Sequence, residues 1–354
     1  MSRDIFDDSP ARERNFASDN NSGVCPEVME AMKVCNRDHA PGYGDDALTR
    51  KASGLMQELF ETDCETFFVF NGTAANALAL ASVCRPHNAI LCHRLSHVET
   101  DECGAPEFFT GGSKLLGLEG EQGKLSAAAI EQAATAREDV HFPMPKVVTL
   151  TQATELGTIY RMDELRAVKE TCQRQGLSFH LDGARFANAM ATLGITAAEF
   201  VRESGVDSLS FGATKNGTAV GDAVVFFKKE AACEFEYRRK QAGQLASKMR
   251  YLAAPWLALL TDDLWLRNAG HANEMAERLA AGLAAFPELQ VQFPREANSV
   301  FIELSDEVQG TLFAKGWKFY PFVREGVYRF MCSWDTTEAD IDDFLADLSV
   351  ELAK

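Results

Sequence analysis

Residues with side chains suited to catalysis stand at the ends of three apolar runs. Asn71-Gly72-Thr73 separates the run TFFVF from an Ala-rich stretch, Asp182 closes LSFHLD (177–182), and Lys215 follows VDSLSF (206–211). A lysine at the end of a buried strand is partly desolvated, which lowers the pKa of its amine and frees it to attack a carbonyl. Taken singly, the three groups have ordinary explanations as a helix cap, a structural acid and a solvated lysine.

Taken together, the three groups suit one cofactor, pyridoxal 5′-phosphate. Free amides at a helix N-terminus, with Gly72 and Thr73, suit its phosphate. A carboxylate at Asp182 suits its pyridine nitrogen, and the amine of Lys215 suits its aldehyde. The patterns G-x-G-x-x-G and G-x-x-x-x-G-K-[ST] are absent from the sequence, so a dinucleotide or nucleoside triphosphate site has no motif support.

The elements that must position these groups alternate between apolar runs and helical stretches. Continuous apolar runs without in/out alternation predict buried strands, here at 66–70, 88–92, 146–151, 177–182, 206–211 and 223–227. Helical spacing predicts helices between them, at 26–35, 47–60, 73–84 and 162–176. Interleaved strands and helices indicate a mainly parallel sheet covered on both faces, which binds ligands at the carboxyl ends of its strands.

The pattern changes after about residue 260. A long helix at 262–286 is followed by short strands at 291–293, 299–304 and 327–334, and a last helix begins near Thr337 with Asp340 as its capping box. We therefore predict three parts: an N-terminal arm (1–20), a large cofactor-binding α/β domain (21–260) and a small C-terminal α+β domain (261–354).

Composition narrows the class of protein and of partner. The chain of 354 residues has 35 Lys and Arg against 52 Asp and Glu, for a formal net charge of −17. Such an acidic surface repels phosphate backbones and anionic lipid heads, so we expect no nucleic-acid and no membrane partner. Nine irregularly spaced cysteines without a C-x-x-C pair, and an N-terminus without an apolar core, predict reduced thiols and a cytoplasmic location.

On these motifs the sequence resembles the threonine aldolases of the aspartate-aminotransferase-like fold (fold type I). The resemblance covers about residues 15 to 350. It implies an α/β large domain with a mostly parallel seven-stranded sheet and a small C-terminal α+β domain. The matching stretches are FASDN (16–20), YGDD (43–46), NGTAAN (71–76), SHVETDECGA (96–105), HLDGARFANA (180–189), GATKNGTAVGD (212–222), SKMRYLAAP (247–255) and VYRF (327–330).

The resemblance implies how the cofactor ring would be held. Lys215 would bond to the aldehyde, Asp182 would pair with the pyridine nitrogen and Arg185 would contact the ring hydroxyl oxygen. His97 would stack on the ring. Because His97 follows His93 by four residues, a metal pair is an alternative, but no third ligand of suitable spacing follows, and we predict no metal site.

The resemblance also implies how phosphate and substrate would be bound. Gly72 and Thr73 would hold the phosphate, with Arg250 of a neighbouring subunit reaching it. Ser18 and Arg329 would bind the substrate carboxylate. Arg329 lies in an apolar strand, where an unpaired arginine is costly, so either a substrate carboxylate or a structural acid must face it. Two further residues, Tyr43 and Asp45, would line the site across a dimer interface.

Simpler explanations exist for some of these residues. Ser18 is also explained as a helix cap, Tyr43 as a turn residue and Arg250 as a surface charge.

One residue departs from the family pattern. Many members have a histidine in the loop after the strand that precedes the Asp motif, and Glu155 stands there in TQATELGTIY (151–160). That position is tied to handling the β-hydroxyl of the substrate. The base is therefore either Glu155 or His97. The lysine turn also differs from the commoner Ser-Lys-Gly-Leu form, with Thr214, Asn216 and Gly217 around the lysine.

The activity implied is that of a carbon–carbon lyase. L-threonine, L-allo-threonine or a related β-hydroxy-α-amino acid such as phenylserine would be cleaved between Cα and Cβ to glycine and an aldehyde. The resemblance suggests a homotetramer, a dimer of dimers with shared active sites. The alternatives are another pyridoxal-phosphate reaction on the same fold (β-elimination, transamination or racemisation) and a non-catalytic binding protein.

Overall fold

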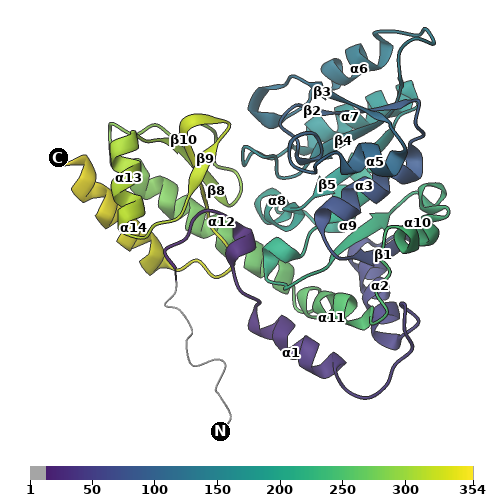
Figure 1. Cartoon of the computed structure of the whole chain (residues 1–354), viewed down its shortest axis with the longest axis horizontal. Coiled ribbons are helices and arrows are strands. Elements are labelled where there is room, and N and C mark those ends of the chain that lie inside the picture. The colour runs from purple at the N-terminus through teal and green to yellow at the C-terminus, as the bar shows by residue number, and fades with distance from the viewer. Residues whose placement is uncertain (1–12, 354) are drawn as a thin grey trace.

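The computed structural model describes residues 13–353, and its larger part is built on one seven-stranded sheet (Figure 1). The strand order is β1-β7-β6-β5-β4-β2-β3. Neighbouring strands from β3 to β6 are parallel, and β7 runs antiparallel to β1 and β6. The mainly parallel sheet predicted from the apolar runs is confirmed. The strands are β1 (Glu65–Val69), β2 (Asn88–His93), β3 (Lys114–Leu118), β4 (Met144–Thr151), β5 (Ser178–Gly183), β6 (Ser208–Phe211) and β7 (Asp222–Phe226).

Helices cover both faces of this sheet. Because successive residues of a strand point to opposite faces, each strand packs against helices on both sides. Val148 of β4 packs among side chains from α2, α7, α9 and α11, whereas Val147 packs on the other face with α3 and α4. Continuous apolar strands are the consequence, since neither face meets water. The helices of this part are α1 (Pro26–Cys35), α2 (Ala47–Phe60), α3 (Gly72–Val83), α4 (His97–Thr100), α5 (Ala105–Thr110), α6 (Ala127–Thr135), α7 (Met162–Gln175), α8 (Phe186–Leu193), α9 (Ala197–Ser204), α10 (Phe235–Gln241) and α11 (Arg250–Leu259).

The smaller part packs three helices on a three-stranded antiparallel sheet, at the left of Figure 1. The predicted capping box is present, because Thr337 and Asp340 hydrogen-bond each other's backbone N–H groups. The strand predicted at 291–293 is wrong, since only a single bridge from Val291 to Ile302 forms there. The elements are α12 (Leu264–Leu283), β8 (Ser299–Glu303), α13 (Asp306–Ala314), β9 (Tyr320–Phe322), β10 (Arg324–Met331) and α14 (Glu338–Leu352).

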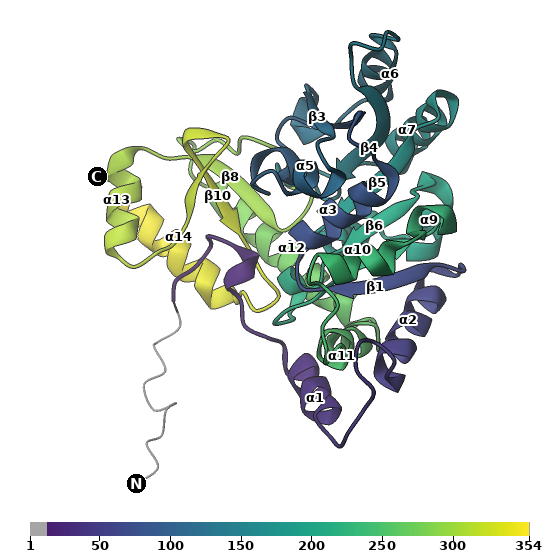
Figure 2. The ribbon, with the colours of Figure 1, turned by 45° about the vertical axis from the view of Figure 1, so that its right-hand side comes forward.

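Two segments connect the parts, as Figure 2 shows from a second direction. Helix α12 places Trp265 in the core of the large sheet and Leu279 in the core of the small one. The chain before α1 lies on the small part, where Phe16 donates its amide to Lys318 O at 2.8 Å and is buried against Trp317. Of the predicted arm (1–20), residues 1–12 lie outside the described residues. The proposed boundary at residue 260 falls just before α12.

Across residues 13–353, none of the helices combines the length and the apolar character needed to cross a lipid bilayer.

Candidate active site

A cavity of about 340 Å³ opens at the carboxyl ends of β4, β5 and β6. It is the place where an open α/β sheet is expected to bind its ligand. The predicted site residues that line it are Ser18, Gly72, Thr73, His97, Glu155, Asp182, Arg185, Lys215 and Arg329. Tyr43, Asp45 and Arg250 do not line it.

The N-terminus of α3 forms one end of the cavity. Asn71 has extended backbone angles and caps the helix, because its Oδ1 accepts the amide of Ala74 at 2.9 Å. Within the described chain, the amides of Gly72 and Thr73 have no hydrogen-bond acceptor. These two free donors and the positive end of the helix dipole suit an anion such as phosphate.

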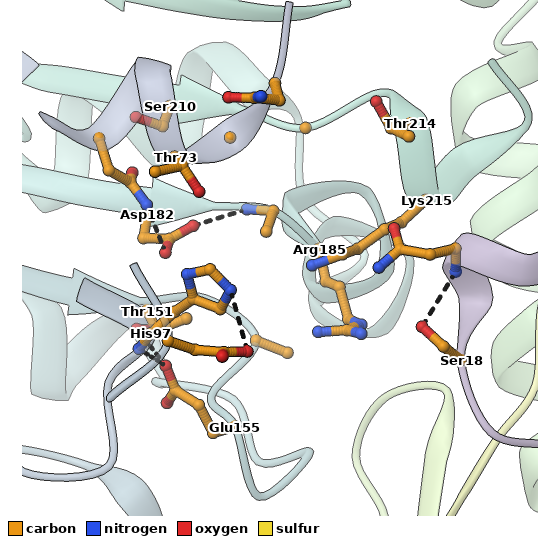
Figure 3. A pocket seen from close by; sticks show the side chains of 18 of the residues that line it. Ser18, Thr73, His97, Thr151, Glu155, Asp182, Arg185, Ser210, Thr214 and Lys215 are labelled. Atoms are coloured by element: carbon orange, nitrogen blue, oxygen red, sulfur yellow. Dashed lines mark hydrogen bonds and ion pairs between the residues drawn. The ribbon is translucent and has the colours of Figure 1, made fainter. Parts of the chain in front are cut away.

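Lys215 enters the cavity from a short 3₁₀ turn, η3 (Thr214–Asn216), that follows β6 (Figure 3). The turn is fixed to α12, since Asn216 Nδ2 donates to Trp265 O at 2.9 Å. Burial lowers the pKa of the Lys215 amine, and the positive charge of Arg185 lowers it further. A lowered pKa provides more neutral amine for attack on an aldehyde.

Asp182 is the next-to-last residue of β5 and is held by a hydrogen-bond network that the sequence did not reveal. Its Oδ1 accepts the amide of Ala184 at 3.0 Å, and its Oδ2 accepts Asn76 Nδ2 at 2.9 Å. The same Asn76 nitrogen donates to Glu102 Oε1 at 2.8 Å, and Glu102 Oε1 lies 2.9 Å from His97 Nδ1. The network fixes the direction of the Asp182 carboxylate and of the His97 ring together. The hydrogen bond to Glu102 raises the pKa of His97.

Glu155 accepts a hydrogen bond that fixes the backbone of His97. Its Oε1 accepts the His97 amide at 2.8 Å and the Thr151 hydroxyl at 2.9 Å. Its Oε2 is buried without a hydrogen-bond partner in the described chain. Burial raises the pKa of Glu155 to about 7, and the nearby Asp182 adds to the rise. Figure 3 shows Glu155 next to His97 and Thr151, on the side of the cavity away from Lys215.

Arg185 forms a bidentate ion pair with Asp19, which the sequence analysis did not single out. Arg185 Nε and Nη2 donate to Asp19 Oδ2 and Oδ1 at 2.7 and 2.8 Å. Asn298 Nδ2 also donates to Asp19 Oδ2, at 3.0 Å. Burial alone would raise the pKa of Asp19, but Arg185, together with Lys215 and Asn298, outweighs it and holds that pKa below its ordinary value. The only sequence signal was the position of Asp19 inside FASDN.

Arg329 lies at the other end of the cavity, with aromatic rings around it. Its guanidinium lies 4.9 Å from the ring centre of Tyr320 and 4.6 Å from that of Phe322, and it donates to Tyr320 OH. Its Nε is buried and has no acceptor in the described residues. A structural acid therefore does not occupy this nitrogen. Ser18 lines the same region but also caps the turn Asp19–Asn21, since its Oγ accepts Asn20 N at 3.1 Å.

Three predicted residues lie outside the cavity of a single chain. Tyr43 is 52% exposed, and Lys240 stacks over its ring at 4.8 Å. Asp45 is exposed, and Arg250 donates to Asp38 O at 3.2 Å. Their predicted roles require a second chain.

The residues present fit pyridoxal phosphate, with free helix amides, a carboxylate and a lysine around one cavity. A side chain in place of Gly212 would collide with Ala184, whose carbonyl oxygen would lie 2.6 Å from the new Cβ. Glycine therefore permits the close approach of the two strand ends. Within residues 13–353, no group of three or more metal-ligating side chains is found. Both ring nitrogens of His93 are engaged, by Gly120 O at 3.1 Å and Leu95 N at 3.1 Å.

Known proteins are similar to this chain in sequence and in fold. The beta-eliminating lyase family model matches residues 15–307. A low specificity L-threonine aldolase of Pseudomonas aeruginosa is 56% identical over 95% of this chain and 97% of its own, and one of Pseudomonas sp. is 54% identical over the same shares. The structure of a Leishmania major threonine aldolase superimposes with a TM-score of 0.90 at 30% identity, covering 96% of this chain and 99% of that chain. The predicted fold type I architecture is thus confirmed. The chain belongs to the beta-eliminating lyases and, within them, to the low-specificity L-threonine aldolases.

Proposed function

We propose that the protein uses pyridoxal 5′-phosphate to cleave L-threonine, L-allo-threonine and related β-hydroxy-α-amino acids to glycine and an aldehyde. The observation that carries the proposal is the convergence of Lys215 and Asp182 on one cavity, between the free amides of α3 and the guanidinium of Arg329. Relatives named as low specificity L-threonine aldolases, more than half identical along nearly the whole chain, support the same reaction.

The protein's own groups would hold the cofactor at four points. Gly72 and Thr73 would donate to the phosphate, Lys215 would bond to the aldehyde, and Asp182 would pair with the pyridine nitrogen and keep it protonated. Arg185, oriented by Asp19, would contact the ring hydroxyl oxygen. When bound, the cofactor supplies an electron sink for the pair released by the breaking Cα–Cβ bond.

Substrate orientation would decide which bond breaks. Arg329 lines the cavity and has an unpaired Nε, so its guanidinium can donate to the substrate carboxylate. Ser18 is placed to assist. A carboxylate held at this end would fix rotation about the bond to Cα and so select which bond at Cα breaks.

A base must take the proton of the β-hydroxyl. We assign this role to His97, whose ring is partly exposed in the cavity and whose Nδ1 is held by Glu102. Glu155 is less suited, because one oxygen already accepts two hydrogen bonds and the other is buried. Its role is then to fix the backbone of His97. Reprotonation at Cα yields glycine.

We also propose a homotetramer with shared sites, in the cytoplasm. Two large aromatic side chains are exposed on helices that both contact α3: Phe108 of α5 is 77% exposed and Tyr237 of α10 is 71% exposed. Tyr43 lies under Lys240 of α10, which places a predicted cross-interface residue in the same region. Exposed aromatic side chains are enriched at protein–protein interfaces. All nine cysteines are free thiols, which supports a reducing location.

Incubation with L-threonine tests the reaction. Glycine and acetaldehyde in equal amounts are expected, whereas ammonia with a keto acid would indicate elimination or transamination. Lys215→Ala should lose the yellow colour and activity of the holoenzyme together. A Lys215→Ala protein that stays yellow and active would refute the assignment of Lys215.

A further inference from the structure

Asp222, the first residue of β7, is a buried acid. It lies between the end of α3, which is expected to hold the cofactor phosphate, and Lys215, which is expected to bond to the cofactor aldehyde. It lines the cavity with Gly72 and Lys215. Its Cα pairs across the sheet with Val69, shortly before the N-terminus of α3.

The two oxygens of Asp222 have different surroundings. Oδ1 accepts the amides of Ala213 and Thr214 at 2.8 and 3.2 Å, and the Thr214 hydroxyl at 3.2 Å. Oδ2 is directed to Gly72, since a Cβ built on Gly72 would lie 3.4 Å from it. One oxygen thus holds the lysine turn, and the other faces the helix end where a phosphate is expected.

We infer that Asp222 is part of the phosphate site and is protonated when the phosphate is bound, so that its Oδ2–H donates to a phosphate oxygen. The inference rests on the proposed cofactor. A phosphate monoester carries about −1.5 to −2 charges at pH 7, and a like charge within a few Å disfavours the ionised form of a carboxyl group. A protonated carboxyl still accepts hydrogen bonds, so the contacts of Oδ1 are kept.

The charged groups around Asp222 influence the pKa of its carboxyl group. Lys215 faces it from η3 and favours the ionised form, whereas Asn71, Gly72 and Thr73 of the neighbouring helix end carry no charge. Burial raises the pKa of Asp222 and outweighs the hydrogen bonds from Ala213 and Thr214. Arg250 of a neighbouring copy would add a positive charge that is shared with the phosphate.

Cofactor affinity measured against pH tests the inference. Pyridoxal 5′-phosphate and pyridoxal, which lacks the phosphate, are titrated into the cofactor-free chain from pH 6 to 9 and followed by absorbance. For the wild type, the dissociation constant of pyridoxal 5′-phosphate should rise with pH, because the complex needs a proton on Asp222. The rise should be steeper than for Asp222→Asn by up to about tenfold per pH unit. The variant lacks this dependence because its side-chain amide donates at every pH. Pyridoxal should give the same slope for both proteins.

Two further variants separate this role from a purely structural one. Asp222→Ala should weaken binding of the phosphate form more than binding of pyridoxal. Asp207→Asn, which alters an acid at the opposite end of β6 whose Oδ2 accepts Phe179 N, should leave both slopes as in the wild type. The inference would be overturned if the affinity for pyridoxal 5′-phosphate changed with pH equally in the wild type and in Asp222→Asn. It would also be overturned if Asp222→Ala lost equal affinity for pyridoxal 5′-phosphate and for pyridoxal. Failure of the wild type to bind pyridoxal phosphate would instead refute the proposed function.

Discussion

Individual residues in this site act through their partners. His97 is directed by Glu102, Glu102 shares a donor with Asp182 through Asn76, and Glu155 holds the backbone of His97. Hydrogen bonds in a buried network of this kind are stronger than in water, because the surrounding dielectric is low. The protonation of His97 therefore depends on Glu102 as much as on its own exposure.

Glu102→Gln should move the acid limb of the kcat/KM profile to lower pH. His97 acts as a base when neutral, and its hydrogen bond to Glu102 raises its pKa, so activity is lost as pH falls through that raised value. Glutamine still accepts the Nδ1 proton but removes the charge, which lowers the pKa of His97. The measurement is kcat/KM for L-threonine between pH 5 and 9, with Glu119→Gln, an exposed acid paired with Arg94, as the control.

Glu155→Gln distinguishes the two candidate bases in the same profile. Glutamine keeps the oxygen that accepts the His97 amide, so the acid limb should stay in place if His97 is the base. Because the pKa of Glu155 is raised to about 7, disappearance of the limb in Glu155→Gln would make Glu155 the base instead.

At the scale of elements, the segment before α1 connects the two parts of the chain at the site. Asp19 binds Arg185, which precedes α8 in the large part, and Asn298, which precedes β8 in the small part. Its side chain is fully buried, so the pair is shielded from water. A buried ion pair is costly to break on one side, because the remaining charge is left unpaired.

Asp19→Asn should lower the free energy of unfolding by about 3 kcal/mol, the magnitude typical of removing one charge from a buried pair. Cofactor affinity should fall as well, since Arg185 loses the group that orients it. Denaturant unfolding of the purified chain measures the first effect. Asp63→Asn breaks an exposed pair with Lys229 and should change stability little. Equal stability of the two variants would contradict a linking role for Asp19.

At the scale of the whole molecule, the exposed aromatic side chains of α5 and α10 predict self-association. Phe108→Glu and Tyr237→Glu should lower the molecular mass measured by light scattering, because a charge there must be desolvated at an interface. Val140→Glu, at a position 95% exposed in the loop after α6, is the matched control. Unchanged mass in both aromatic variants would place the interface elsewhere.

Shared sites can be tested by complementation. When Lys215→Ala and Arg250→Ala chains are co-expressed, half of randomly formed dimers are mixed, and one of the two sites in each mixed dimer has both residues intact. About a quarter of the wild-type activity should then return, as two-fold symmetry requires. No recovery would show that Arg250 does not act in a neighbouring site.

The sequence by itself determined the sheet, its strand ends and the groups that follow them. Continuous apolar runs need burial on both faces, and polar residues directly after such runs must lie at one edge of the sheet. Lys215, Asp182 and Gly72-Thr73 were therefore predictable as neighbours. Edge strand β3 was not, because only one of its residues, Leu115, is buried and its composition gives a weak signal.

Only the tertiary structure decided the partners of these groups. Asp19 meets Arg185 across 166 positions, and Asn76 meets Asp182 across 106. Tyr320 reaches Arg329 because β9 and β10 pair in a particular register. Contacts of this kind depend on strand order and on how the small part packs against the large one, and neither is encoded in local periodicity or residue type. The acid at Asp222 acquires its place beside Gly72 for the same reason.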